Sequence, residues 1–178
     1  MDEDPTRKVA KWYNTLASSY DELYGQEQAD KHKIILEHIG SGRIGMLLDV
    51  GCGTGRFLQL ADGICDMEVG VDVSRSMLLI AKNRRSARND LVQAVSSSLP
   101  FRNGFADCIV SISTSKAGSD QSELVAESER VGKENSLLAV IGFDQPAKTI
   151  VSQMAKEEFS SKVNGRETLR VYRLNRTC

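Results

Sequence analysis

Three glycines at alternate positions, Gly51, Gly53 and Gly55, follow a short apolar run. Glycine lets the backbone turn tightly and approach a ligand with no Cβ in the way, and a helix that follows offers unpaired N–H groups. The dinucleotide fingerprint would need its third glycine at position 56, which is Arg56, so nicotinamide and flavin cofactors are disfavoured. The spacing predicts a nucleotide-like ligand, and the alternative is a tight turn that binds nothing.

A second apolar run ends in Asp72, 21 positions after Gly51. A carboxylate at the end of a second strand can accept hydrogen bonds from both hydroxyls of a ribose. Because a phosphate on that ribose would repel the carboxylate, we expect an unphosphorylated ribose.

The elements that must position these residues alternate along the chain. We expect apolar strands over 46–50, 68–73, 91–95, 108–112 and 137–143, and helices over 12–24, 29–39, 56–61, the segment after Ser74, and 124–131. Such alternation predicts a parallel sheet with helices on both faces. Residues 159–163 and 167–174 flank Asn164-Gly165, which is typical of a type I′ turn, so the sheet should finish with an antiparallel hairpin.

Length and composition limit the class of protein. The 178 residues suit one domain, and a net charge of −1 supplies no general field to recruit nucleic acid or an anionic membrane. The four cysteines form no C-x-x-C pair, so we expect reduced thiols and no metal site. The polar N-terminus and the absence of an apolar run of about 18 residues predict a cytoplasmic protein without a membrane segment.

The sequence resembles the class I S-adenosylmethionine-dependent methyltransferases, in particular the subgroup with ubiquinone/menaquinone-biosynthesis and several tRNA and rRNA methyltransferases. The resemblance covers nearly the whole chain and is carried by residues 12–21, 48–57, 69–77, 99–101, 107–111 and 129–131. It implies an α/β, Rossmann-like class I methyltransferase fold with a C-terminal antiparallel hairpin. It also implies one methyltransferase domain over 1–178, with a helical lid over 1–40 and the catalytic core over 41–178.

The resemblance implies that the cofactor is S-adenosyl-L-methionine. The cofactor-binding residues that it implies are Asp49, Gly51, Gly53, Gly55, Asp72, Val73, Ser96, Tyr13 and Tyr20. In this assignment Asp72 holds the ribose, and the two tyrosines lie near the sulfonium, whose positive charge suits an aromatic face. The alternative for each tyrosine is a core aromatic residue. Val95 stands where the family usually has an Asp that binds the adenine amino group, so one hydrogen bond worth about 0.5–1.5 kcal/mol is absent.

The residues that could bind the methyl acceptor form a weaker sequence pattern than those of the cofactor site. Methyl transfer is an in-line displacement that needs a general base only if the nucleophile holds a proton. Ser113, Lys116 and Asp144 follow the fourth and fifth strands, at the end where open α/β sheets bind ligands, and are the candidates for substrate contact. His32 and His38 are expected at solvated or capping positions, so no catalytic residue is assigned. The Asn/Asp-Pro-Pro-Tyr pattern is absent, which disfavours glutamine and exocyclic-adenine acceptors.

Two features suggest partners. Basic residues gather at Lys82, Arg84, Arg85 and Arg88, and again at Lys162, Arg166, Arg170, Arg173 and Arg176, where RNA contact is the alternative to solvated faces. The strand Leu91 to Val95 is expected at a sheet edge and carries no charge, so another chain can pair with it. Some methyltransferases of the family do pair there with a small zinc-binding activator protein, and a homodimer is the alternative.

The resulting functional hypothesis is an S-adenosylmethionine-dependent methyltransferase whose acceptor is RNA, protein or a small molecule. The triple glycine and Asp72 support this hypothesis. The alternative is a catalytically weak, methyltransferase-like binding subunit that acts through a protein partner. Val95, the absence of an assigned base and the lack of a substrate-binding insert support it.

Overall fold

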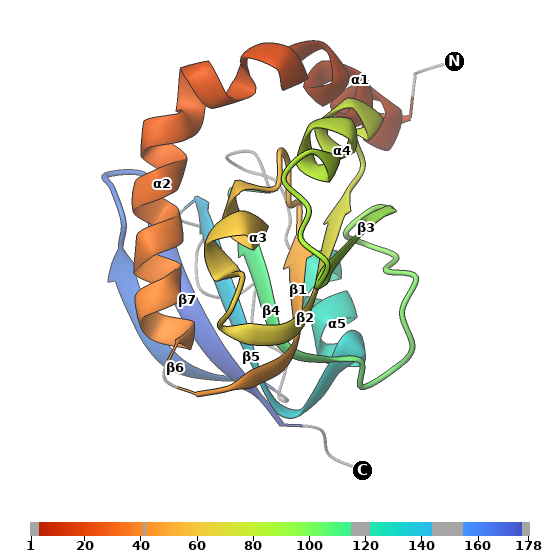
Figure 1. Ribbon diagram of the computed structural model, residues 1–178. Coiled ribbons are helices and arrows are strands. Elements are labelled where there is room, and N and C mark those ends of the chain that lie inside the picture. Colours follow the sequence, from red (N-terminus) through yellow and green to blue (C-terminus); the bar gives the residue numbers. More distant parts are fainter. Residues whose placement is uncertain (1–3, 41, 115–121, 144–154, 176–178) are drawn as a thin grey trace.

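The computed structural model describes residues 4–40, 42–114, 122–143 and 155–175. Helices surround a seven-stranded sheet (Figure 1). In chain order the elements are α1 (Pro5–Leu16), the 3-10 turn η1 (Ala17–Ser19), α2 (Tyr20–Ile39), β1 (Ile44–Val50), α3 (Arg56–Ala61), β2 (Cys65–Asp72), α4 (Arg75–Lys82), β3 (Asn89–Gln93), β4 (Ala106–Ile112), α5 (Ser122–Val131), β5 (Gly132–Phe143), β6 (Ala155–Lys162) and β7 (Glu167–Leu174).

The strand order, β3-β2-β1-β4-β5-β7-β6, determines where a ligand can bind. Strands β1 to β5 pair in parallel, and β7 runs antiparallel between β5 and β6. The chain proceeds outward from β1 to β3 and then returns to place β4 on the other side of β1. Such a reversal leaves a crevice at the carboxyl ends of the two central strands. The predicted Rossmann-like α/β fold with a C-terminal antiparallel hairpin is confirmed.

Alternation along the strands divides the core into two layers. Leu47 belongs to a cluster with Ile35 of α2 and Phe57 of α3, whereas Leu48 belongs to a second cluster with Val125 of α5. Neighbouring residues of a strand point to opposite faces, so one sheet buries apolar side chains on both sides. Helices α2 and α3 therefore cover one face, and α5 covers the other (Figure 1).

The predicted boundary between the two N-terminal helices is wrong. The helices meet at η1, Ala17–Ser19, and residues 25–28, which were expected to separate them, lie inside α2. Gly25 lies within this helix, and the guanidinium of Arg56 occupies the space where a Cβ would be. Helix α1 begins at Pro5, where the Asp4 carboxylate accepts a hydrogen bond from Thr6 N at 3.0 Å.

The predicted hairpin between β6 and β7 is confirmed, but the prediction of a type I′ turn is wrong. Neither Asn164 nor Gly165 adopts the positive φ that such a turn requires. The Asn164 side chain organises a longer loop instead, because its Oδ1 accepts from the backbone N–H groups of Arg166 (2.9 Å) and Glu167 (2.8 Å). This side chain thus replaces the strained backbone of a two-residue turn.

Strand β3 is the sheet edge, as predicted, but its position is shifted. It spans Asn89–Gln93 and therefore contains Asp90, whose exposed carboxylate lies 3.6 Å from Arg85. The expectation of an uncharged edge strand over 91–95 is wrong, since the chain leaves the ladder after Gln93. The fifth parallel strand also starts earlier than predicted, at Gly132.

Two further observations concern the described residues. Cys52, Cys65 and Cys108 are buried free thiols, as predicted, and Cys178 lies outside the described residues. Across the described ranges, every helix is too short or too polar to cross a lipid bilayer.

The two-layer core yields a test of the packing. Leu48→Ala removes a fully buried side chain from the centre of the sheet and should lower the free energy of unfolding by about 2–5 kcal/mol. Leu79→Ala, on an exposed position of α4, should change it by less than about 0.5 kcal/mol. Urea unfolding followed by circular dichroism measures both values, and equal midpoints would contradict the assignment of Leu48 to the core.

Candidate functional site

The glycine loop after β1 adopts a backbone that other residues rarely reach. Gly51, Gly53 and Gly55 have φ angles of 82°, 53° and 77°. A Cβ at Gly51 would collide with the side chain of Thr114, and one at Gly55 would lie 2.9 Å from the Cβ of Ala81. Gly53 differs because a Cβ at this position would have nothing within 4 Å, so this glycine borders open space. The first and third glycines thus allow close packing, and the middle one leaves room for a ligand.

Asp72 at the end of β2 fixes this loop. Its Oδ2 accepts a hydrogen bond from Gly53 N at 2.9 Å, and its Oδ1 accepts one from Ser74 N at 2.7 Å. Burial raises the pKa of the Asp72 carboxyl, and the backbone hydrogen bonds from Ser74 and Gly53 oppose that rise. Because each carboxylate oxygen has a second lone pair, both can also accept from a ligand.

Asp49 is a buried carboxyl group without a complete set of partners. It is 2 % exposed, and its Oδ2 has no hydrogen-bond partner among the described residues. Burial, together with the negative charges of Asp72 and Glu68, raises the pKa of Asp49 to about 8. An unpartnered buried oxygen beside a second carboxylate is a position that suits a positively charged group.

A cavity of about 410 Å³ opens at the carboxyl ends of β1, β2 and β4. Eight of the predicted site residues line it: Gly51, Gly53, Asp72, Val73, Ser96, Tyr13, Tyr20 and Ser113. Asp49 borders a smaller adjoining pocket that shares Gly51, Gly53 and Tyr20, and Gly55 packs against α4 instead of lining the cavity. Val95 is part of the wall beside Ser96, which agrees with the sequence alignment of this segment. Lys116 and Asp144 lie outside the described residues.

Polar contacts hold the N-terminal helices over this cavity. Asn14 Oδ1 accepts from Ser74 Oγ at 2.8 Å and from Ser76 N at 3.0 Å, which ties α1 to α4. Asp21 accepts from Arg84 at 2.5 Å and from Thr54 Oγ1 at 2.8 Å, which ties α2 to the glycine loop. Asn14 and Asp21 lie in the segment 12–21 that carries the family resemblance, but sequence reasoning gave them no role because their partners are distant in the sequence.

Two expectations about charged side chains are wrong. His32 is 7 % exposed, its ring packs edge-on against Phe57, and burial lowers its pKa to about 4, so it is a neutral core residue.

Arg84, expected on a solvated or RNA-binding face, donates to Asp21 and to the Thr54 carbonyl at 2.8 Å. Arg173 forms an ion pair with Glu158 at 3.1 Å and donates a hydrogen bond to the Asn135 carbonyl at 2.9 Å. The two basic clusters therefore contribute partly to internal contacts.

The fold and this site define an α/β protein with a cavity at the switch point of its sheet. Residues 48–140, more than half of the chain, match the family described as "Methyltransferase domain". The chain therefore belongs to the S-adenosylmethionine-dependent methyltransferase family.

Relatives within this family differ in what they act on. An 18S rRNA (guanine-N(7))-methyltransferase of Schizosaccharomyces pombe is 32 % identical over 87 residues, which cover 48 % of this chain and 32 % of that protein. A ubiquinone/menaquinone biosynthesis C-methyltransferase of Francisella philomiragia is 27 % identical over 175 residues, with 90 % and 68 % covered. The chain thus spans about one third of the first relative and about two thirds of the second.

A solved structure shares the fold at low identity. A chain from the complex between the Haloferax volcanii Trm112 methyltransferase activator and a methyltransferase superposes with a TM-score of 0.78 at 11 % identity. The match covers 92 % of this chain and 98 % of that one. At this identity the likeness concerns the fold alone.

The raised pKa of Asp49 predicts a pH dependence of cofactor binding. Below about pH 8 this carboxyl is largely protonated in the free protein, and a bound cation favours its ionised form, so binding should release a proton. The dissociation constant of S-adenosylmethionine should fall as pH rises from 6 to 8, by up to about tenfold per unit. Calorimetry at three pH values measures it.

Asp49→Asn should remove this dependence, and Asp66→Asn, on the exposed end of the following strand, should leave it unchanged. A constant affinity of the wild-type protein between pH 6 and 8 would contradict the role of Asp49.

Proposed function

We propose that this protein transfers a methyl group from S-adenosylmethionine to an acceptor. The observation that carries the proposal is the open glycine turn at Gly51 and Gly53, fixed by the Asp72 carboxylate at the edge of a 410 Å³ cavity. A cavity of this size lies within the usual range for small-molecule and cofactor sites. The family to which the chain belongs and its methyltransferase relatives support the proposal.

The residues present fit each part of this cofactor. Asp72 has lone pairs for the two ribose hydroxyls, and the unpartnered Oδ2 of Asp49 suits the ammonium of the methionyl end. Val73 and Ser96 line the cavity, where Val73 can contact adenine and the backbone N–H of Ser96 can donate to it. When bound, S-adenosylmethionine supplies a methyl group on a positively charged sulfur. Tyr13 and Tyr20 offer aromatic faces to that charge and help to exclude water.

Of the arguments for the alternative, a catalytically weak binding subunit, Val95 is the one that concerns the cofactor site. The loss of one hydrogen bond at Val95 weakens adenine binding by roughly tenfold at most, which does not abolish a site with several other contacts. The intact contacts of Asp72 and the open space at Gly53 favour an active enzyme.

Asp72→Asn tests the cofactor site. The amide keeps the size of the side chain but donates where the carboxylate accepted, so the loss of charge-assisted hydrogen bonds should raise the dissociation constant of S-adenosylmethionine by roughly 10- to 100-fold. Calorimetry measures the constant, and circular dichroism checks that the variant is folded. Asp66→Asn on the same strand is the matched control. Unchanged affinity in the Asp72 variant would refute the ribose assignment.

We propose further that a small activator protein, of the zinc-binding kind that the family uses, pairs with β3. This strand is the parallel edge of the sheet, and its outer hydrogen-bonding groups face away from β2. Ala94 N donates inward to Asp72 O at 3.2 Å, so the N–H of the preceding Gln93 points outward. The activator complex of the structural neighbour supports this proposal. A homodimer through β3 and contact with RNA are the competing assignments.

Gln93→Pro removes the outward N–H and leaves the inner ladder intact, because proline is tolerated where a strand edge faces outward. Co-expressed with the Trm112 activator of Haloferax volcanii, the wild-type protein and Gln93→Ala should elute as a heterodimer in size-exclusion chromatography with light scattering. Gln93→Pro should elute as a monomer. A wild-type protein that stays monomeric with the activator, or a proline variant that still binds it, would refute pairing through β3.

A further inference from the structure

A second cavity, of about 620 Å³, adjoins the cofactor cavity. Tyr13, Tyr20 and Ser113 line both, so the two spaces meet at these side chains. The second cavity is rich in aromatic residues, with Trp12, Tyr13, Tyr20, Tyr24 and Phe143 in its wall, although aromatic residues make up 6 % of the sequence. The Tyr20 ring lies 6.3 Å from that of Tyr13 and 5.1 Å from that of Tyr24. Such a wall suits a flat aromatic ligand.

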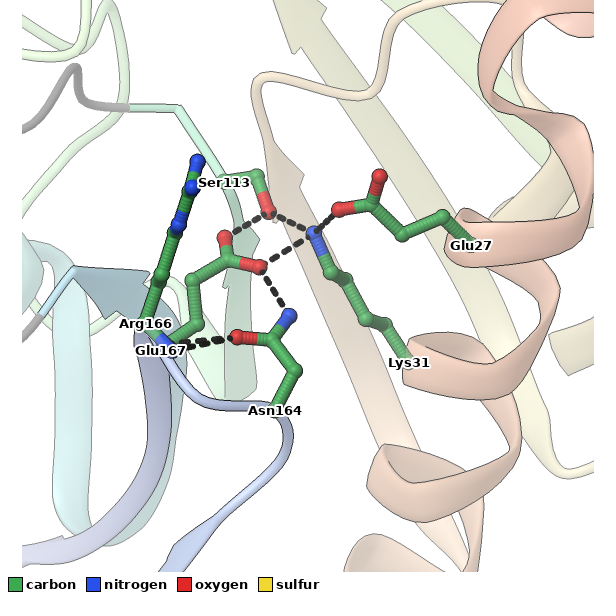
Figure 2. Close-up of polar contacts among 6 residues, drawn as sticks. All are labelled: Glu27, Lys31, Ser113, Asn164, Arg166 and Glu167. Atoms are coloured by element: carbon green, nitrogen blue, oxygen red, sulfur yellow. Dashed lines mark hydrogen bonds and ion pairs between the residues drawn. The ribbon is translucent and has the colours of Figure 1, made fainter.

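A polar cluster forms around the buried pair Lys31 and Glu167 (Figure 2), and it includes Ser113, which lines both cavities. Lys31 reaches from α2 and donates to Glu27 at 2.6 Å, to Glu167 of β7 at 2.6 Å and to Ser113 Oγ at 2.9 Å. Lys31 and Glu167 are 2 % and 3 % exposed. The three N–H bonds of the ammonium thus have three acceptors, and the ammonium has no lone pair with which to take a proton.

Glu167 is kept as an anion by its neighbours. Its Oε1 accepts from Ser113 Oγ at 2.7 Å, and its Oε2 accepts from Lys31 and from Asn164 Nδ2 at 2.8 Å. Burial alone would raise the pKa of Glu167, but the hydrogen bonds from Lys31, Ser113 and Asn164 outweigh it and lower that pKa. Sequence reasoning missed Glu167 because this glutamate follows a hairpin turn and matches no motif.

The Ser113 hydroxyl is oriented by this arrangement. Its proton points to Glu167, and one of its lone pairs accepts from Lys31, which leaves the second lone pair for a donor in the cavity. Ser113 also has a φ of 54°, a backbone conformation that serine rarely adopts. Strain of this kind is found where a side chain is held for a function.

We infer that the second cavity binds the methyl acceptor, a planar aromatic compound whose nucleophile is a hydroxyl or a ring N–H, and that Ser113 and Glu167 remove its proton. This inference rests on the proposed function. The nucleophile's lone pair forms the bond to the methyl carbon while the carbon–sulfur bond breaks and leaves its electron pair on sulfur. The nucleophile's proton passes to Ser113 Oγ, and the Ser113 proton passes to Glu167 Oε1, which becomes a carboxylic acid. A weakly basic carboxylate suffices, because methylation makes the departing proton strongly acidic.

The first experiment measures binding and does not depend on the cofactor. Naphthol and methoxynaphthalene, which lacks the donor hydrogen, are titrated into the protein with and without S-adenosylhomocysteine. Tyr24→Ala should weaken both ligands, whereas Ser113→Gly should weaken naphthol alone, by roughly 2- to 10-fold for one hydrogen bond. Glycine suits the positive φ at this position, so Ser113→Gly should fold well. Glu158→Gln, an exposed ion-paired glutamate of the same hairpin, is the control.

The second experiment measures methyl transfer to naphthol. Ser113→Gly and Glu167→Gln should lower kcat by roughly 100-fold or more, the range of general-base contributions, with unchanged affinity for S-adenosylmethionine. For Glu167→Gln the KM for naphthol should also stay near the wild-type value, a split that a loss of stability alone does not produce.

Two outcomes would overturn the inference. One is a wild-type protein that binds S-adenosylmethionine but neither binds nor methylates naphthol. The other is a Ser113→Gly variant that keeps the wild-type kcat. Absence of cofactor binding would instead refute the proposed function, and the naphthol titration without cofactor still decides whether the second cavity is an aromatic site.

Discussion

The hydrogen bond from Gly53 N to the Asp72 carboxylate, 2.9 Å long, is the interaction on which the site depends. It joins the turn after β1 to the end of β2, beside the switch point between β1 and β4, from which the chain connections run to opposite sides of β1. The turn can reach Asp72 only because its glycines adopt positive φ angles and pack against Thr114 and Ala81. In the proposed cofactor site, the polar contacts therefore come from backbone geometry and from the carboxylates of Asp72 and Asp49.

The N-terminal helices complete the site through a different kind of contact. Helix α1 has no fully buried side chain and is attached by Asn14, and α2 is held at its start by the Asp21–Arg84 pair. The far end of α2 is anchored in the core by Ile35 and Ile39. A segment with few buried apolar contacts opens at a lower free-energy cost than the core does. Residues of this segment, among them Tyr13 and Tyr20, line both cavities.

Features of the fold that depend on short stretches of sequence were predicted correctly. The parallel strands, the glycine loop, Asp72 and the edge position of β3 followed from apolar runs and the family resemblance. The predicted type I′ turn was wrong because the Asn164 side chain, rather than a positive φ, organises the hairpin loop. The predicted exposure of His32 was wrong because this polar residue is buried in the core. The Lys31–Glu167 ion pair could not be predicted from the sequence, because its members are far apart in the chain and meet only in the folded protein.

The central claim is that the cavity at the switch point holds S-adenosylmethionine for methyl transfer. Its most direct test is incubation of the protein, alone and with the activator, with S-adenosylmethionine carrying a labelled methyl group and with cell extract later separated into RNA, protein and small molecules. The account predicts label in one of these fractions, and none when the Asp72→Asn variant replaces the wild-type protein. Tight cofactor binding without label in any fraction would contradict the account and favour a binding subunit.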